Sequence, residues 1–242
     1  MTKQAAPVAN TTPEATLEGA GPAQPMLLTR EALLSDRLGD AVRAALGDQV
    51  LSDEAREASL AETLRARPDD GPVWLFGYGS LIWNPTIHYA ESRFARVEGW
   101  HRSFCLCTPI GRGTPENPGL VLALDEGGIC DGIAFRLEEA VLVEELSLIW
   151  RREMITGAYI PHWVPLKDAD GLEYGWGIAF TVNRAASQYA DLPEAEVVHR
   201  LSTAAGALGS AADYLFQTRE GLQKLGIQDA LVEHLALKVS GA

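Results

Sequence analysis

The sequence is poor in positive charge and contains no long apolar run. Its 242 residues include 20 Lys and Arg against 33 Asp and Glu, which gives a net charge of −13 and a pI of about 4.8. Nucleic acids and anionic membrane surfaces both require a basic protein surface, so we expect neither as a partner. No apolar run approaches the ~18 residues of a membrane helix. The composition, which is 47% hydrophobic, instead predicts a soluble protein with a sizeable core.

Cysteine and histidine are too few and too scattered to indicate a disulfide framework or a metal site. The three cysteines, Cys105, Cys107 and Cys130, form no Cys-x-x-Cys pair, and the five histidines show no zinc-ligand spacing. An odd number of such thiols is typical of a reducing compartment. The first 25 residues also lack the apolar core of a secretory signal. We therefore expect a cytoplasmic protein that needs no metal or other cofactor.

The most distinctive stretch is a short apolar strand that runs into two glycines and a serine. Residues 73–76 read as a buried strand. Gly77 and Gly79 then permit a positive φ or the close approach of another group. Successive N–H groups beside Ser80 can form an anion nest or an oxyanion hole, although a plain glycine turn is the simpler interpretation. Dinucleotide-binding, P-loop and nucleophile-elbow signatures are all absent, the last because Ile82 occupies the required glycine position.

The distribution of apolar and polar residues divides the chain into three parts. Residues 1–26 are rich in Ala, Pro and Thr without any period, which predicts a disordered tail. Residues 27–70 are predicted to form an N-terminal helical extension, in which Thr29 and Ser52 cap helices. Residues 71–242 form the main domain, where β-prone runs come first and helices gather late. That order favours an α+β fold with an antiparallel sheet or a small barrel.

Turn signals in the main domain predict two hairpins and one long loop. Glu126-Gly127-Gly128 separates two β-prone runs and gives a tight-turn signal, and residues 167–171 separate another two. The loop at residues 111–119 is too long for a tight turn and carries Arg112. Long loops in compact domains are often functional, although a solvated arginine is the simpler alternative.

One carboxylate falls on the apolar face of a predicted helix, residues 138–156, which Gly157 would terminate. That face is formed by Leu142, Leu146 and Ile149. At 100° per residue Glu153 lies in line with them, whereas Arg151 and Arg152 point elsewhere and are not expected to be its partners. Burial raises the pKa of a carboxyl group, so Glu153 is a candidate general base. A glutamate that reaches solvent at the helix end is an equally simple alternative.

Four motifs follow one another along the chain: residues 73–83, residues 112–116, Arg152-Glu153-Met154 with Gly157 and Tyr159, and residues 209–215. In this order they resemble the ChaC-type γ-glutamylcyclotransferases. The resemblance implies a small mixed, mainly antiparallel β-barrel flanked by helices. It also implies cleavage of glutathione to 5-oxoproline and cysteinylglycine without a metal or other cofactor.

The resemblance assigns roles to individual residues as well. The loop that would hold the γ-glutamyl group comprises Gly77, Tyr78, Gly79, Ser80 and Leu81, extended to Ile82. Glu153 matches the family's base, and Tyr159 and Tyr189 match tyrosines near its site. Arg112 is our own candidate for binding the glycine carboxylate of glutathione, because it lies in a long loop of an acidic protein that must hold an anion.

Two other functions stay open. One is the same chemistry on another γ-glutamyl amine or dipeptide. The other is a non-catalytic regulatory module for a cation transporter, which the family's historical name suggests. The second is disfavoured because a non-catalytic module does not need Glu153 on a core-facing stripe.

Overall fold

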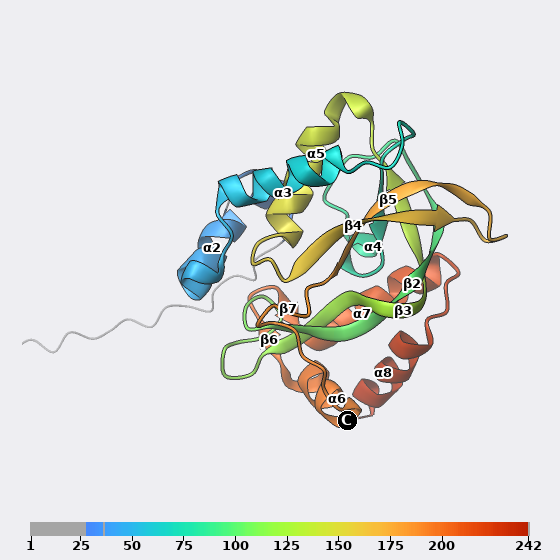
Figure 1. The fold of residues 1–242 in the computed structure, drawn as a ribbon. Coiled ribbons are helices and arrows are strands. Elements are labelled where there is room, and N and C mark those ends of the chain that lie inside the picture. The colour runs from blue at the N-terminus through green and yellow to red at the C-terminus, as the bar shows by residue number, and fades with distance from the viewer. Residues whose placement is uncertain (1–27, 36, 242) are drawn as a thin grey trace, which may run out of the picture.

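The strands of the computed structural model, which describes residues 28–35 and 37–241, close into a barrel with helices on both sides (Figure 1). The strands are β1 (Trp74–Gly77), β2 (Glu91–Thr108), β3 (Gly119–Arg136), β4 (Tyr159–Lys167) and β5 (Glu173–Val182). They follow the order β1-β3-β2-β4-β5 around the barrel, and only the pairings of β5 with β1 and with β3 are parallel. The predicted α+β fold with a mixed, mainly antiparallel barrel is confirmed. The predicted tail, residues 1–26, lies outside the described residues.

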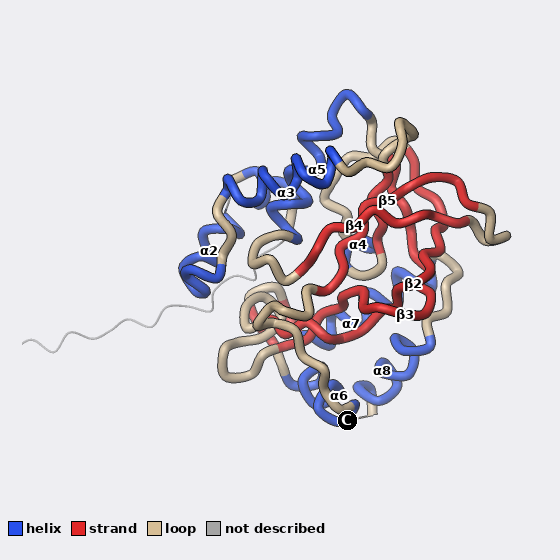
Figure 2. Tube along the Cα trace, in the orientation of Figure 1, coloured by secondary structure: helices blue, strands red, loops and turns tan. Residues whose placement is uncertain are grey.

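Helices cover the barrel from two sides (Figure 2). Three helices precede β1, namely α1 (Arg30–Leu34), α2 (Arg37–Leu46) and α3 (Asp53–Arg65), with the 3₁₀ turn η1 (Gly47–Gln49). Helix α4 (Ser80–Trp83) follows β1, and the 3₁₀ turn η2 (Glu139–Val141) and α5 (Leu142–Glu153) follow β3. The later elements are α6 (Glu194–Thr203), α7 (Ala211–Lys224), α8 (Ala230–Ser240) and the two-residue strands β6 (Ala205–Gly206) and β7 (Gly209–Ser210). The predicted caps Thr29 and Ser52 accept hydrogen bonds from the N–H groups of Ala32 and Ala55. No described helix is both long and apolar enough to cross a bilayer.

Strand β1 lies between two hydrophobic clusters, which explains its unbroken apolar sequence. Trp74 and Phe76 pack into a cluster that includes residues of α7 and α8. Leu75 packs on the opposite face against Ile149 and Trp150 of α5. All four residues of β1 are buried. A strand covered on both faces reads as a continuous apolar run, so the prediction of a buried strand here is confirmed.

The hairpin predicted at Glu126-Gly127-Gly128 is wrong. β2 and β3 are single paired strands of 18 residues each, which continue past these glycines. Gly127 and Gly128 have φ of 96° and 75°, opposite Gly99 with φ of 84°, where the register shifts. A bulge built on glycines with positive φ uses the same residues as a tight hairpin turn, so the residue signal is the same for both. The hairpin predicted at residues 167–171 is confirmed between β4 and β5.

Helix α5 is shorter than predicted but presents the expected face. It begins after a 3₁₀ turn and ends at Glu153, so the boundary predicted at Thr156 is wrong. Gly157 has φ of 66° but lies beyond the helix rather than at its end. Leu146 and Ile149 are completely buried, which confirms the apolar stripe. The early end places Glu153 in the last turn of the helix, beside the loop that follows β1.

Candidate active site

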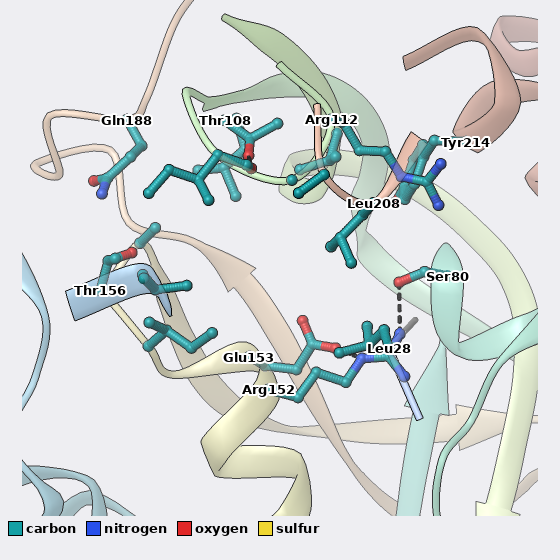
Figure 3. A pocket seen from close by; sticks show the side chains of 18 of the residues that line it. Leu28, Ser80, Thr108, Arg112, Arg152, Glu153, Thr156, Gln188, Leu208 and Tyr214 are labelled. Carbon is teal, nitrogen blue, oxygen red and sulfur yellow. Dashed lines mark hydrogen bonds and ion pairs between the residues drawn. The ribbon is translucent and has the colours of Figure 1, made fainter. Parts of the chain in front are cut away.

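A cavity of about 540 Å³ opens between the end of α5, the loop after β2, helix α7 and the N-terminal segment (Figure 3). Its wall includes four predicted site residues, Ser80, Arg112, Glu153 and Tyr159. A recess of about 20 Å³ shares Ser80, Glu153 and Tyr159 with this wall and adds Tyr78, Gly79 and Leu81. The structure therefore brings together seven of the residues that sequence and resemblance indicated.

The three remaining candidates lie elsewhere. Gly77 is the last residue of β1 and Ile82 lies in α4, and neither is part of either lining. Tyr189 is also outside both linings: it bridges to Leu106 of β2, and Arg184 lies 5.7 Å from the centre of its ring. Its neighbour Gln188 lines the cavity instead.

The two glycines of the loop are needed for space and not for a positive φ. Neither adopts a positive φ, and Gly79 has φ of −135°, so of the two roles that a glycine permits here the positive φ is not used. A Cβ atom on Gly79 would lie 2.8 Å from the Tyr214 hydroxyl, and one on Gly77 would lie 3.2 Å from the Cβ atom of Leu81. The close approach predicted at these glycines is confirmed, and it lets the loop pack directly against α7.

Tyr78 fixes the loop to the barrel. Its buried hydroxyl donates to the carbonyl oxygen of Phe180 at 2.6 Å. Its own carbonyl oxygen accepts from the Nε of Arg102 at 2.6 Å, and that buried guanidinium also pairs with Asp229 at 2.8 Å. Both the side chain and the carbonyl group of Tyr78 are therefore held by the barrel, and the residue lines the recess together with Glu153 and Tyr159.

The carboxylate of Glu153 is directed into the cavity (Figure 3). Its side chain is 13% exposed, and its Oε1 lies 2.8 Å from the Nε of Arg152. Burial raises the pKa of Glu153, although the adjacent guanidinium opposes the shift. The expectation that Arg152 is no partner is wrong. The Cβ atoms of consecutive helix residues point in very different directions. The long side chain of Arg152 nevertheless bends past the end of the helix and reaches the carboxylate of Glu153.

Arg152 links the carboxylate of Glu153 to Ser80 of the glycine loop, residues 77–82. Its second terminal nitrogen, Nη2, donates to the Oγ of Ser80 at 2.8 Å, and Nη1 donates to the Oγ1 of Thr86 at 3.2 Å and to the carbonyl oxygen of Asn84. Thr86 has φ of 59°, a strained conformation for a β-branched residue. A buried charge is stable only with such partners. The network holds one oxygen of Glu153, and the other is available to a ligand.

Two tyrosines flank Glu153 in both linings. The hydroxyl of Tyr159 donates to the carbonyl oxygen of Leu122 at 2.9 Å, and the hydroxyl of Tyr214 accepts from the N–H of Leu122 at 3.4 Å. Burial raises the pKa of Tyr159 well above its usual range and that of Tyr214 to about 12, so both phenols are neutral near pH 7. Sequence reasoning missed Tyr214 as a site residue, and its place in the motif at residues 209–215 was the signal available.

Arg112 places a half-buried positive charge on the cavity wall. Its guanidinium donates to the carbonyl oxygen of Ser210 at 3.2 Å and lies 5.9 Å from the ring centres of both Trp83 and Tyr214. Burial lowers the pKa of Arg112, but a guanidinium stays charged at neutral pH. Among the described residues no carboxylate forms an ion pair with it. The charge is therefore available to an anionic ligand.

Comparison with known proteins points to one family. The family model for ChaC-like proteins matches residues 73–242. The chain is 45% identical to the glutathione-specific γ-glutamylcyclotransferase of Escherichia coli over 88% of its length and 92% of that protein. It is 29% identical to the human glutathione-specific γ-glutamylcyclotransferase 1, over 69% and 77%. The crystal structure of a glutathione-specific γ-glutamyl cyclotransferase from yeast matches 71% of this chain and 97% of its own, with a TM-score of 0.64 at 19% identity, a likeness of fold.

Proposed function

Because this chain belongs to the ChaC-like family, we propose that it is an enzyme that cleaves glutathione into 5-oxoproline and cysteinylglycine. The observation that carries the proposal is the carboxylate of Glu153, which faces the cavity with a raised pKa beside the glycine loop. The relatives named for this activity support the choice of substrate.

The reaction needs only one proton acceptor. Glu153 takes a proton from the α-ammonium group of the substrate, and the freed amine attacks the γ-carbonyl carbon of the same residue. The five-membered ring closes as the bond to the cysteine nitrogen breaks, and the protonated Glu153 returns its proton to that nitrogen. Since the attack is intramolecular, the protein contributes mainly by holding one conformer.

The loop after β1 supplies the electrostatic part of the mechanism. The N–H groups of Tyr78, Gly79, Ser80 and Leu81 bind the α-carboxylate or the oxyanion that develops on the γ-carbonyl. Arg102 and Phe180 hold Tyr78 in place, so these donors need little reorganisation during the reaction. The neutral hydroxyl of Tyr214 lies in the same recess and adds a donor to the set.

A direct test is to incubate the purified protein with glutathione and to quantify 5-oxoproline and cysteinylglycine. We expect the two products in equal amounts. A γ-glutamyl amine and γ-glutamylalanine serve as alternative substrates, and higher turnover of either would shift the proposal to that compound. No turnover of any of the three would favour the regulatory module over the enzyme.

The activity should also depend on pH in a way set by Glu153. The base must be ionised, so kcat/KM rises as pH increases through the raised pKa of Glu153. The midpoint of this acid limb should lie above the ordinary glutamate pKa of about 4.3. Arg152→Gln removes a charge that lowers this pKa, so the limb moves to higher pH. Arg151→Gln is the matched control, because Arg151 instead donates to the carbonyl oxygen of Leu33. An acid limb at or below the ordinary value contradicts the assignment.

Arg112 is proposed to bind the glycine carboxylate of glutathione. Arg112→Ala should weaken binding, mainly through KM, by up to about 1.5–3 kcal/mol for one charged hydrogen bond. Glutathione esterified at the glycine carboxylate has already lost this contact, so the substitution should hardly change its KM. Arg184→Ala, at a half-exposed arginine outside the cavity lining, is the control. An equal loss for both substrates would mean that Arg112 binds another part of the substrate.

A further inference from the structure

One wall of the cavity comes from residues that precede the part of the chain matched by the family model. The match begins at residue 73, but Leu28, Thr29, Val42 and Leu46 all line the cavity. We call these four residues the N-terminal wall. Nothing in the mechanism above requires them, because the base, the loop and Arg112 all lie within the matched region.

Buried polar contacts anchor the N-terminal wall to the barrel. Both terminal nitrogens of Arg30 donate to Glu145 of α5, at 2.6 and 2.8 Å, and the Glu145 side chain is 2% exposed. The same guanidinium donates to the carbonyl oxygen of Thr86 at 3.4 Å. The side-chain amide of Asn84 donates to the carbonyl oxygen of Leu28 at 2.8 Å. A bidentate pair to a buried carboxylate is costly to break, so these contacts hold the segment of Leu28 and Arg30 against the barrel.

The apolar contacts of the wall reach both functional loops. Val42 is buried with Leu33 of α1 and Leu148 of α5, and this cluster is completed by partly buried side chains. Those side chains are Leu28, Leu46, Val50, Ile110 and Ile155. Ile110 lies two residues before Arg112, and Ile155 lies two residues after Glu153. The wall therefore adds aliphatic groups to the same cavity that Glu153 and Arg112 line.

We propose that the N-terminal wall determines specificity for the leaving group. It encloses the part of the substrate that follows the γ-glutamyl unit, a dipeptide that begins with a thiol-bearing residue. The inference rests on the proposed cyclotransferase function. Cysteine behaves as a small apolar side chain, and aliphatic groups around it exclude water and add contacts that a shorter leaving group does not make. The wall thus favours glutathione over γ-glutamyl amino acids.

The test compares two substrates in variants that thin or release the wall. Leu28→Ala combined with Leu46→Ala should lower kcat/KM for glutathione roughly tenfold or more, the usual effect of lost methylene contacts in an apolar pocket. The value for γ-glutamylalanine should change little. Arg30→Gln removes the bidentate contact with Glu145 at a residue outside the cavity lining. It should likewise lower kcat/KM for glutathione and leave that for γ-glutamylalanine nearly unchanged. Leu34→Ala, at an exposed leucine of α1, is the matched control and should leave both values unchanged.

The outcomes separate this inference from the function on which it rests. If the wild-type protein releases no 5-oxoproline from any γ-glutamyl compound, the proposed function fails. If the wild type is active and the wall variants lower kcat/KM for both substrates by the same factor, the wall has only a structural role and the inference fails. Hydrogen exchange gives a second readout, for which Glu153→Gln is used so that glutathione persists. Exchange of the α2 amides should slow when glutathione binds, and unchanged exchange in the saturated complex contradicts a contact.

Discussion

Replacing Glu153 with glutamine should leave a folded protein that has lost almost all turnover of glutathione. Glutamine has nearly the same shape, and its amide oxygen can still accept from Arg152, so the network around Ser80 should persist. It cannot take a proton from the substrate, and loss of general-base catalysis costs roughly 10²–10⁴-fold in rate. The measurement is kcat for glutathione, with thermal unfolding to confirm that the fold is intact.

Two further variants make this result specific. Glu144→Gln changes a carboxylate on the same helix whose side chain is 66% exposed, and it should retain full activity. Glu153→Asp keeps the base but moves it back by one methylene, so it should be intermediate between the wild type and the glutamine variant. A folded Glu153→Gln protein with near-normal kcat would show that Glu153 is not the base.

The second large effect concerns the nucleophile. Glutathione acetylated on its α-nitrogen should give no cysteinylglycine, because an amide nitrogen has no basic lone pair to attack the γ-carbonyl and no ammonium proton for Glu153 to remove. A hydrolase uses water or a side chain as its nucleophile and can still cleave the blocked compound. Competition against glutathione shows whether the analogue occupies the cavity. Release of cysteinylglycine from the acetylated compound would rule out cyclisation by the α-amine.

The parts of the fold that local sequence determines were predictable. The strand at residues 73–76 is continuous and apolar because it is covered on both faces. Glu153 follows the apolar stripe of its helix by simple periodicity, and Ser52 caps α3 through its own hydroxyl. Each of these signals acts within a few residues, so it does not depend on the rest of the fold.

The errors arise where a local signal has two structural solutions. Gly127 and Gly128 supply the positive φ of either a hairpin or a bulge, and only the pairing of β2 with β3 decides between them. The direction of the Arg152 guanidinium depends on where α5 ends and on the position of Ser80. Neither can be obtained from the angular spacing of side chains on a helix.

The composition of the cavity depends on contacts between distant segments. Tyr214 reaches the glycine loop because Gly79 has no side chain to exclude it, across a long sequence separation. The N-terminal wall depends on the pairing of Arg30 with Glu145, which no local pattern indicates. These residues follow from tertiary packing, which explains why sequence reasoning indicated Glu153 and the glycine loop as cavity residues but missed the N-terminal wall.

The central claim is that the substrate's own amine closes the ring, and the product formed in ¹⁸O-labelled water tests it most directly. Cyclisation incorporates no oxygen from water, whereas hydrolysis places one in the glutamate that it releases. We therefore predict unlabelled 5-oxoproline as the first product from glutathione, as measured by mass spectrometry at low conversion. Labelled glutamate as the first product would contradict the mechanism, even if Glu153 proved essential.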